Sequence, residues 1–192
     1  MSDGFNARKA AQLAAFFCNR EGAPIPVLKL VKLVYLADRQ FLETYGFPIT
    51  NDTHVSMPHG PVNSATLNHI GGIVDAPEWN DLIAGRAGHN VAIARQLTDV
   101  DTDELSEAEI EVMDAVWEKF GHMTKFEIVQ WTHDNCPEWE DPKGSSYVIP
   151  LERTLRYLGF DNADQFAKRS EVYRDFQRVL GDLREQNADS PW

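Results

Sequence analysis

The stretch from Pro24 to His69 constrains the fold of this chain more than any other. Its first half carries apolar residues at steps of three or four, a spacing that places them on one face of a helix. Those apolar residues are Leu30, Leu33, Val34, Ala37 and Phe41. We therefore predict a buried helix over residues 27–44. The polar side of this helix is predicted to carry Lys29, Lys32, Asp38 and Arg39.

The second half of this stretch changes character at Gly46 and Pro48, which end the helix. The run from Thr53 to Met57 predicts a short strand. Residues 58–61, Pro-His-Gly-Pro, predict a tight corner that leads into a helix over residues 62–70. Pro61 would occupy the first turn of that helix, where an amide hydrogen has no partner and proline is tolerated.

The rest of the chain predicts further helices. One covers residues 5–20 and ends at Gly22. Two capping boxes, Ser106 to Glu109 and Thr124 to Glu127, begin helices that run to about Phe120 and His133. Further helices are predicted over residues 151–159 and from about 163 to 185.

A β-hairpin is predicted over residues 79–83 and 89–94, where two short segments flank a glycine-containing turn. Together with residues 53–57 it would form a small antiparallel sheet beside the helices. The expected fold class is therefore α+β, mainly α, with six or seven helices. The length of 192 residues predicts one domain over residues 1–186, followed by a frayed tail at 187–192.

The composition predicts a cytoplasmic protein. No apolar run approaches the roughly 18 residues that a membrane span needs, and the N-terminus resembles an amphipathic helix more than a signal peptide. The two cysteines, Cys18 and Cys136, form no Cys-x-x-Cys pair. Free, buried thiols are the expectation for both.

The formal net charge of −12 lies almost entirely in the second half of the chain, where residues 101–192 hold 10 Lys and Arg against 21 Asp and Glu. Such a field attracts basic partners and disfavours nucleic acid. The segment from Asp99 to Glu118 holds nine acidic residues and no basic one. It is a contact surface for a basic partner, with Glu107 and Glu111 as candidate residues, a mimic of an anionic ligand, or a solvated helix face.

Several sequence blocks resemble one family. The blocks are KLVKLVYLADRQ, YGFPIT, MPHGPV and, later, EIVQWTH followed by PEW. In order and spacing they resemble the Panacea domain of SocA-like antitoxins. The resemblance implies a non-enzymatic protein that binds and neutralises a toxin encoded beside it. It leaves open direct occlusion of the toxin or delivery of the toxin to a cytosolic protease, with this protein as the adaptor.

Catalytic signals are weak. The six histidines lack the spacing of a metal site, so neither a metal nor another cofactor is expected. His133 and Cys136 lie close enough in sequence to form a nucleophile pair, but their acidic neighbourhood does not favour a thiolate. Two alternatives remain: a small hydrolase or nuclease-like enzyme, and an interaction module with no toxin partner.

Candidate partner-binding residues fall into three further groups, each with a purely structural alternative. His59, Gly60 and Pro61 form either part of a binding site or a turn that joins two elements. Trp131, Thr132, His133 and Trp139 form either an interaction site or a lid over a small core. Tyr35 lies off the apolar stripe of the central helix, and with Asp38 it is a candidate for a second interface.

Overall fold

The computed structural model describes residues 4–188, except for the side chains of residues 99–100, 173, 177–178 and 180–188. Its helices are α1 (Ala7–Glu21), α2 (Val27–Tyr45), α3 (Ser64–Ile70), α4 (Pro77–Asn80), the 3-10 helix η1 (Asp99–Thr102), α5 (Glu107–Phe120), α6 (Lys125–Asn135), α7 (Leu151–Tyr157) and α8 (Ala163–Ala188). Its strands are β1 (Ile25–Pro26), β2 (His54–Met57), β3 (Gly60–Asn63), β4 (Asn90–Val91) and β5 (Tyr147–Val148). The α+β, mainly α class is confirmed. The eight α-helices in this part of the chain exceed the predicted six or seven by at least one.

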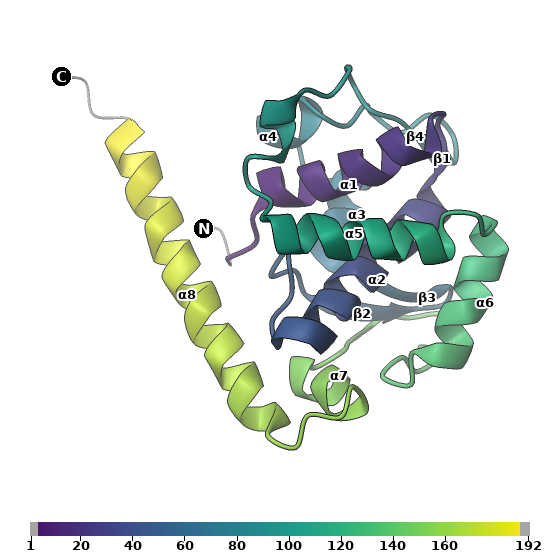
Figure 1. Ribbon diagram of the computed structural model, residues 1–192, viewed down its shortest axis with the longest axis vertical. Coiled ribbons are helices and arrows are strands. Elements are labelled where there is room, and N and C mark those ends of the chain that lie inside the picture. Colours follow the sequence, from purple (N-terminus) through teal and green to yellow (C-terminus); the bar gives the residue numbers. More distant parts are fainter. Residues whose placement is uncertain (1–3, 189–192) are drawn as a thin grey trace.

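Helix α2 lies at the centre of the domain, as Figure 1 shows. It contacts α1, α3, α5, α6 and α7 as well as β1 and β3. The predicted apolar stripe is buried along its whole length. The predicted polar side is wrong, because Lys29, Lys32 and Asp38 are buried as well. From Lys29 to Asp38 every residue of α2 is buried, so this part of the helix has no solvent-facing stripe.

The buried polar side chains of α2 each hold a distant segment. Asp38 accepts hydrogen bonds from the backbone N–H groups of Ile49 and Thr50, at 2.9 and 3.1 Å. It also accepts one at 2.6 Å from the side-chain amide of Asn63 on β3. The hydroxyl of Tyr35 and the guanidinium of Arg39 both donate to the Glu138 carboxylate. These bonds satisfy charges that would otherwise be costly to bury.

The strand predicted at residues 53–57 is confirmed as β2. The helix predicted over residues 62–70 is present as α3, but its predicted start at Val62 is wrong. Residues 60–63 form β3 instead, paired antiparallel with β2 so that Pro61 lies opposite Ser56. Helix α3 begins only at Ser64. Asp52 caps it from outside, accepting from the N–H groups of Ala65 and Thr66 at 2.8 Å each. The first-turn amides are thereby satisfied without a proline.

The predicted hairpin is correct only in part. Residues 77–80 form the short helix α4, which begins with Pro77 in its first turn. Beyond it, Ile83 and Ile93 face each other as an isolated antiparallel bridge. Strand β4 pairs with β1 and not with β2, whose second neighbour is β5. Two small sheets therefore replace the single predicted one.

The predicted C-terminal helices are present as α7 and α8. They enclose a second small core of Leu42, Leu155, Ala163 and Ala167. Figure 1 shows α8 leaving this core and running alongside the body of the domain. It continues to Ala188, and the remainder of the predicted tail, residues 189–192, lies outside the described residues.

Several local predictions are confirmed. Gly22 and Gly46 cap α1 and α2 in the left-handed conformation, with φ of 69° and 81°. Both capping boxes are formed, at Ser106 with Glu109 and at Thr124 with Glu127. Cys18 and Cys136 are free and buried. None of the helices that the structure describes combines the length and apolar character needed to cross a membrane.

Candidate functional site

The turn between β2 and β3 meets the C-terminal half of α6. A β-carbon added to Gly60 would lie only 2.7 Å from Thr132 Oγ1 and 3.0 Å from Lys32 Nζ, and Gly60 has a φ of +93°. Both facts require glycine at this position. The contact brings together two candidate groups that lie about 70 residues apart in the sequence. The corner cluster, as we name it, consists of His59, Gly60, Pro61, Thr132, His133 and Trp139.

An aromatic pair forms one part of the corner cluster. The rings of His133 and Trp139 are stacked, with centroids 4.0 Å apart and planes at 6°. The indole N–H of Trp139 donates to the carbonyl of Met57 at 2.9 Å, which ties this pair to the end of β2. Both residues are half-buried. Burial and the nearby charge of Lys32 lower the pKa of His133 below its usual value, so the ring is neutral at physiological pH.

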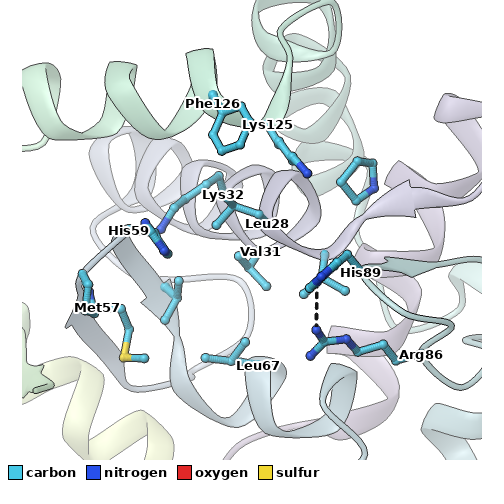
Figure 2. A pocket seen from close by; sticks show the side chains of 14 residues that line it. Leu28, Val31, Lys32, Met57, His59, Leu67, Arg86, His89, Lys125 and Phe126 are labelled. Carbon is cyan, nitrogen blue, oxygen red and sulfur yellow. Dashed lines mark hydrogen bonds between the residues drawn. The ribbon is translucent and has the colours of Figure 1, made fainter. Parts of the chain in front are cut away.

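Lys32 lies beneath the corner cluster, next to His59 (Figure 2). Its side chain is fully buried, and its ammonium donates to the carbonyl of Pro61 at 2.7 Å. Among the described residues no carboxylate pairs with it. Burial lowers the pKa of Lys32 to about 7. The residue beneath the corner cluster is therefore an amine whose protonated form has no carboxylate partner among the described residues.

The proposed Cys–His nucleophile pair is not activated. Cys136 is fully buried, and burial together with the nearby Glu138 carboxylate raises the pKa of its thiol to about 12. The thiol is therefore protonated at neutral pH, whereas a nucleophilic cysteine needs a thiolate. Its neighbour His133 stacks on Trp139 instead of holding a catalytic proton.

Tyr35 and Asp38 lie inside the core and not at a second interface. Tyr35 is fully buried, with its hydroxyl 2.5 Å from Glu138 Oε1 and its ring edge-on to His54. Asp38 is fully buried among its donors. In this conformation neither residue is accessible to a partner. Trp131 is half-buried against Phe120, at a centroid distance of 4.6 Å, and supports α6 from the side of α5.

The segment that forms these contacts coincides with a known protein family. Residues 30–140 match the family described as Antitoxin SocA-like, Panacea domain. The chain belongs to this family. The match begins within α2 and ends directly after Trp139, so it contains all of the corner cluster and Lys32, Asp38 and Arg39 of α2. Neither the curated proteins nor the solved structures contain a match to this chain.

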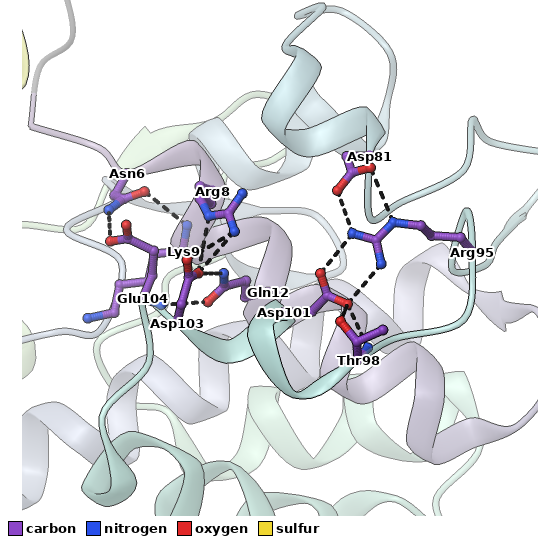
Figure 3. Close-up of polar contacts among 10 residues, drawn as sticks. All are labelled: Asn6, Arg8, Lys9, Gln12, Asp81, Arg95, Thr98, Asp101, Asp103 and Glu104. Atoms are coloured by element: carbon purple, nitrogen blue, oxygen red, sulfur yellow. Dashed lines mark hydrogen bonds and ion pairs between the residues drawn. The ribbon is translucent and has the colours of Figure 1, made fainter. Parts of the chain in front are cut away.

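Much of the acidic segment of this Panacea domain is engaged internally, as Figure 3 shows. Asp101 pairs with Arg95 at 2.7 Å, and this pairing holds the pKa of Asp101 well below its usual range. Asp103 accepts from Arg8 and Gln12 on α1. These acids attach η1 to the rest of the domain and are not free for a partner.

Glu107 and Glu111 remain on the surface of the Panacea domain. Both are exposed, and no ion pair involves them within the described part of the chain. The intervening Glu109 points the other way, caps Ser106 and pairs with Lys9 at 2.6 Å. In Figure 1 α6 adjoins the far end of α5, so the two exposed acids lie apart from the corner cluster.

Sequence reasoning missed an apolar stripe on α8. Val172, Phe176 and Val179 are 69%, 57% and 51% exposed. Their spacing of four and three residues places them on one helix face. That spacing was visible in the sequence, but the many charges of this helix obscured it. Such a stripe is typical of a contact surface.

Metal ligation finds no support in the described residues. Among them, no group of three or more His, Cys, Asp or Glu side chains is placed to hold a metal ion. His54 lies 3.4 Å from Asp38, and His69 contacts a backbone carbonyl in its own helix. These two histidines serve the core of the Panacea domain.

Proposed function

We propose that this Panacea domain is a cytoplasmic antitoxin that binds and neutralises a toxin protein encoded beside its gene. The family match over residues 30–140 is the observation that carries the proposal. A binding role is also supported by the protonated state of Cys136 and by the internal use of Tyr35 and Asp38. The proposal concerns binding to a protein and involves no catalytic step.

The exposed part of the corner cluster is the proposed contact with the toxin. His59 is exposed at the tip of the hairpin, and the stacked rings of His133 and Trp139 lie beside it, half-buried. Half-buried aromatic side chains on a rigid support lose little conformational entropy on binding and supply much of the affinity of an interface. Gly60 and Lys32 provide that support.

Glu107 and Glu111 are proposed to accelerate the encounter with a basic toxin. They project from α5 without internal partners in the described residues, and the whole chain carries −12. Charges at the rim of an interface change the association rate and its salt dependence more than the dissociation rate. Substitutions in the corner cluster are therefore expected to change mainly the dissociation rate, and those at Glu107 and Glu111 mainly the association rate.

Two routes of neutralisation follow from binding. In direct occlusion, the antitoxin covers the active surface of the toxin and leaves its lifetime unchanged. As a proteolytic adaptor, it delivers the toxin to a cytosolic protease and shortens that lifetime. A pulse–chase measurement of the toxin in cells with and without the antitoxin distinguishes them.

The test is co-expression with the neighbouring open reading frame, followed by growth assays and binding kinetics on the purified pair. We expect the neighbour to arrest growth alone and the antitoxin to restore it. His59→Ala should speed dissociation about tenfold or more. His122→Ala, which removes an exposed histidine from the loop before α6, is the matched control and should leave the kinetics unchanged.

The double variant Glu107→Lys, Glu111→Lys should slow association and reduce its dependence on salt, with the circular dichroism spectrum unaltered. If both surfaces tolerate substitution with unchanged kinetics, the contact lies elsewhere, and Phe176→Ser on the α8 stripe is the next variant. If the neighbour is harmless when expressed alone, the antitoxin assignment fails and an interaction module without a toxin partner replaces it.

A further inference from the structure

A pocket of about 320 Å³ opens beside the corner cluster (Figure 2). Its walls come from the first half of α2, the β2–β3 turn, α3, the segment before β4 and the start of α6. Leu28 and Val31 of α2 and Leu67 of α3 form an apolar floor. The volume and the apolar lining are those of a site for a small organic molecule.

The ionisable side chains that line this pocket are all basic. They are Lys32, His59, Arg86, His89 and Lys125. No acidic side chain is among its lining residues, although the chain holds 30 Asp and Glu against 18 Lys and Arg. The sequence alone suggested an unfavourable field for anions, and the folded structure locally reverses it.

In the part of the chain that the structure describes, the cations at this pocket form no ion pair, whereas many of those elsewhere do. Several arginines on other faces form ion pairs, for example Arg8 with Asp103 and Arg153 with Glu140. Within the described residues, Lys32, Arg86 and Lys125 form none. The charges of Arg86 and Lys125 are therefore not cancelled within the described residues, and both side chains line a space large enough for a ligand.

Two of these side chains already make local contacts in the protein without a ligand. The Arg86 side chain donates from Nε to the carbonyl of Gly88 at 2.5 Å, and its terminal nitrogen lies 3.3 Å from Nδ1 of His89. Lys125 is in the first turn of α6, with its ammonium 5.1 Å from the centre of the Phe126 ring. Figure 2 shows Arg86, His89 and Lys125 on one side of the Val31 floor and His59 with Lys32 on the other. Such preorganisation reduces the entropy lost on binding.

We infer that this pocket binds a small organic anion. The apolar body of the ligand lies on Leu28, Val31 and Leu67, and its carboxylate, sulfonate or phosphate is held by Arg86, His89 and Lys125. Charge-assisted hydrogen bonds from a guanidinium and an ammonium favour such a head group. This inference is independent of the antitoxin role.

Anilinonaphthalene sulfonate is the probe for this site, because it joins an apolar body to one anionic group and fluoresces when bound. Its matched control is N-phenylnaphthylamine, which has the same rings without the sulfonate. Titration of the full chain should give saturable 1:1 binding of the sulfonate. We expect about tenfold weaker binding of the uncharged analogue at this site.

Variants at the pocket locate the bound probe. Arg86→Gln and Lys125→Gln should each weaken binding of the sulfonate about three- to tenfold and leave binding of the uncharged analogue nearly unchanged. Lys168→Gln, on an exposed face of α8, removes the same charge elsewhere and should have no effect.

Labelled methionine methyl groups provide a second readout. The signal of Met57, which lines the pocket, should shift, and that of the core residue Met113 should not.

Three results would overturn the inference. The first is equal affinity for the two probes, and the second is a sulfonate affinity that neither pocket variant lowers. The third is displacement of the sulfonate, mole for mole, by the neighbour-encoded protein with no competition from octanoate or phenyl phosphate. That last result would assign the pocket to an acidic segment of a protein partner.

Discussion

Two buried charges on α2, six residues apart, are accommodated in opposite ways. Asp38 accepts hydrogen bonds from two backbone amides, from Thr50 and Asn63 side chains, and lies within 3.4 Å of His54. Lys32 makes a single hydrogen bond, to the carbonyl of Pro61, among the described residues. The Asp38 carboxylate, which accepts several hydrogen bonds, organises the fold because each of its donors belongs to a segment that it holds in place. The protonated Lys32 side chain has no carboxylate partner among the described residues. Burial of such a charge lowers the stability of the fold and favours an anion nearby.

Removal of the Asp38 carboxylate should have the largest effect on the free energy of unfolding. Asp38→Ala leaves the backbone N–H groups of Ile49 and Thr50 buried without their acceptor, and Asn63 keeps only its bond to the Thr50 hydroxyl. We expect the free energy of unfolding to fall by about 3–5 kcal/mol, measured by urea denaturation followed by circular dichroism. Glu111→Ala, at an exposed and unpaired site, should change it by no more than about 0.5 kcal/mol. A small loss for Asp38→Ala would show that water replaces the carboxylate.

A second comparison uses two carboxylates on either side of Trp139. Glu138 is fully buried and pairs with Arg39 at 2.6 Å, whereas the Glu140 side chain is 67% exposed and pairs with Arg153. Glu138→Gln should cost about 2–4 kcal/mol, because it leaves the Arg39 charge and the Tyr35 hydroxyl poorly compensated. Glu140→Gln should cost less than about 1 kcal/mol, because exposed ion pairs contribute little. Equal losses for the two variants would contradict the distinction by burial.

The parts of the fold that could be predicted from sequence are those fixed by local chemistry. The capping boxes at Ser106 and Thr124 and the terminating glycines Gly22 and Gly46 act within a few residues of themselves. Each therefore appears in the sequence as a complete signal. The apolar stripe of α2 is equally local.

The errors concern residues whose environment is set by distant segments. Pro61 fits the first turn of a helix by local rules, but pairing with Ser56 and the cap that Asp52 provides favour a strand there. The corner cluster depends on Gly60 meeting Thr132, and no spacing in the sequence indicates that contact. The basic pocket likewise gathers Arg86 and Lys125 from separate segments of an acidic chain.

Burial of the Lys32 ammonium should make the free energy of unfolding depend on pH. Burial lowers the pKa of Lys32 from 10.5 to about 7, whereas the unfolded chain keeps the ordinary value. Between these two pH values the unfolded state binds more protons than the folded state. Stability therefore rises with pH over this interval, by at most about 1.4 kcal/mol per pH unit. Below pH 7 the ammonium is charged in both states, and the cost of burying it no longer changes with pH.

Lys32→Met removes this dependence while it nearly preserves the volume of the side chain. The difference in unfolding free energy, wild type minus variant, should increase by about 2 kcal/mol between pH 7 and 9. The absolute difference at pH 7 combines relief of the buried charge with loss of the bond to Pro61, so the slope is the decisive quantity. Contributions of His133 and Cys136 near the site are present in both proteins and largely cancel, because burial is the main cause of both pKa shifts. Lys168→Met removes an exposed ammonium and controls for the change in net charge. A difference that stays constant from pH 7 to 9 would mean that Lys32 keeps its proton in the folded protein. Its ammonium would then be stabilised by its surroundings as well as the Asp38 carboxylate is.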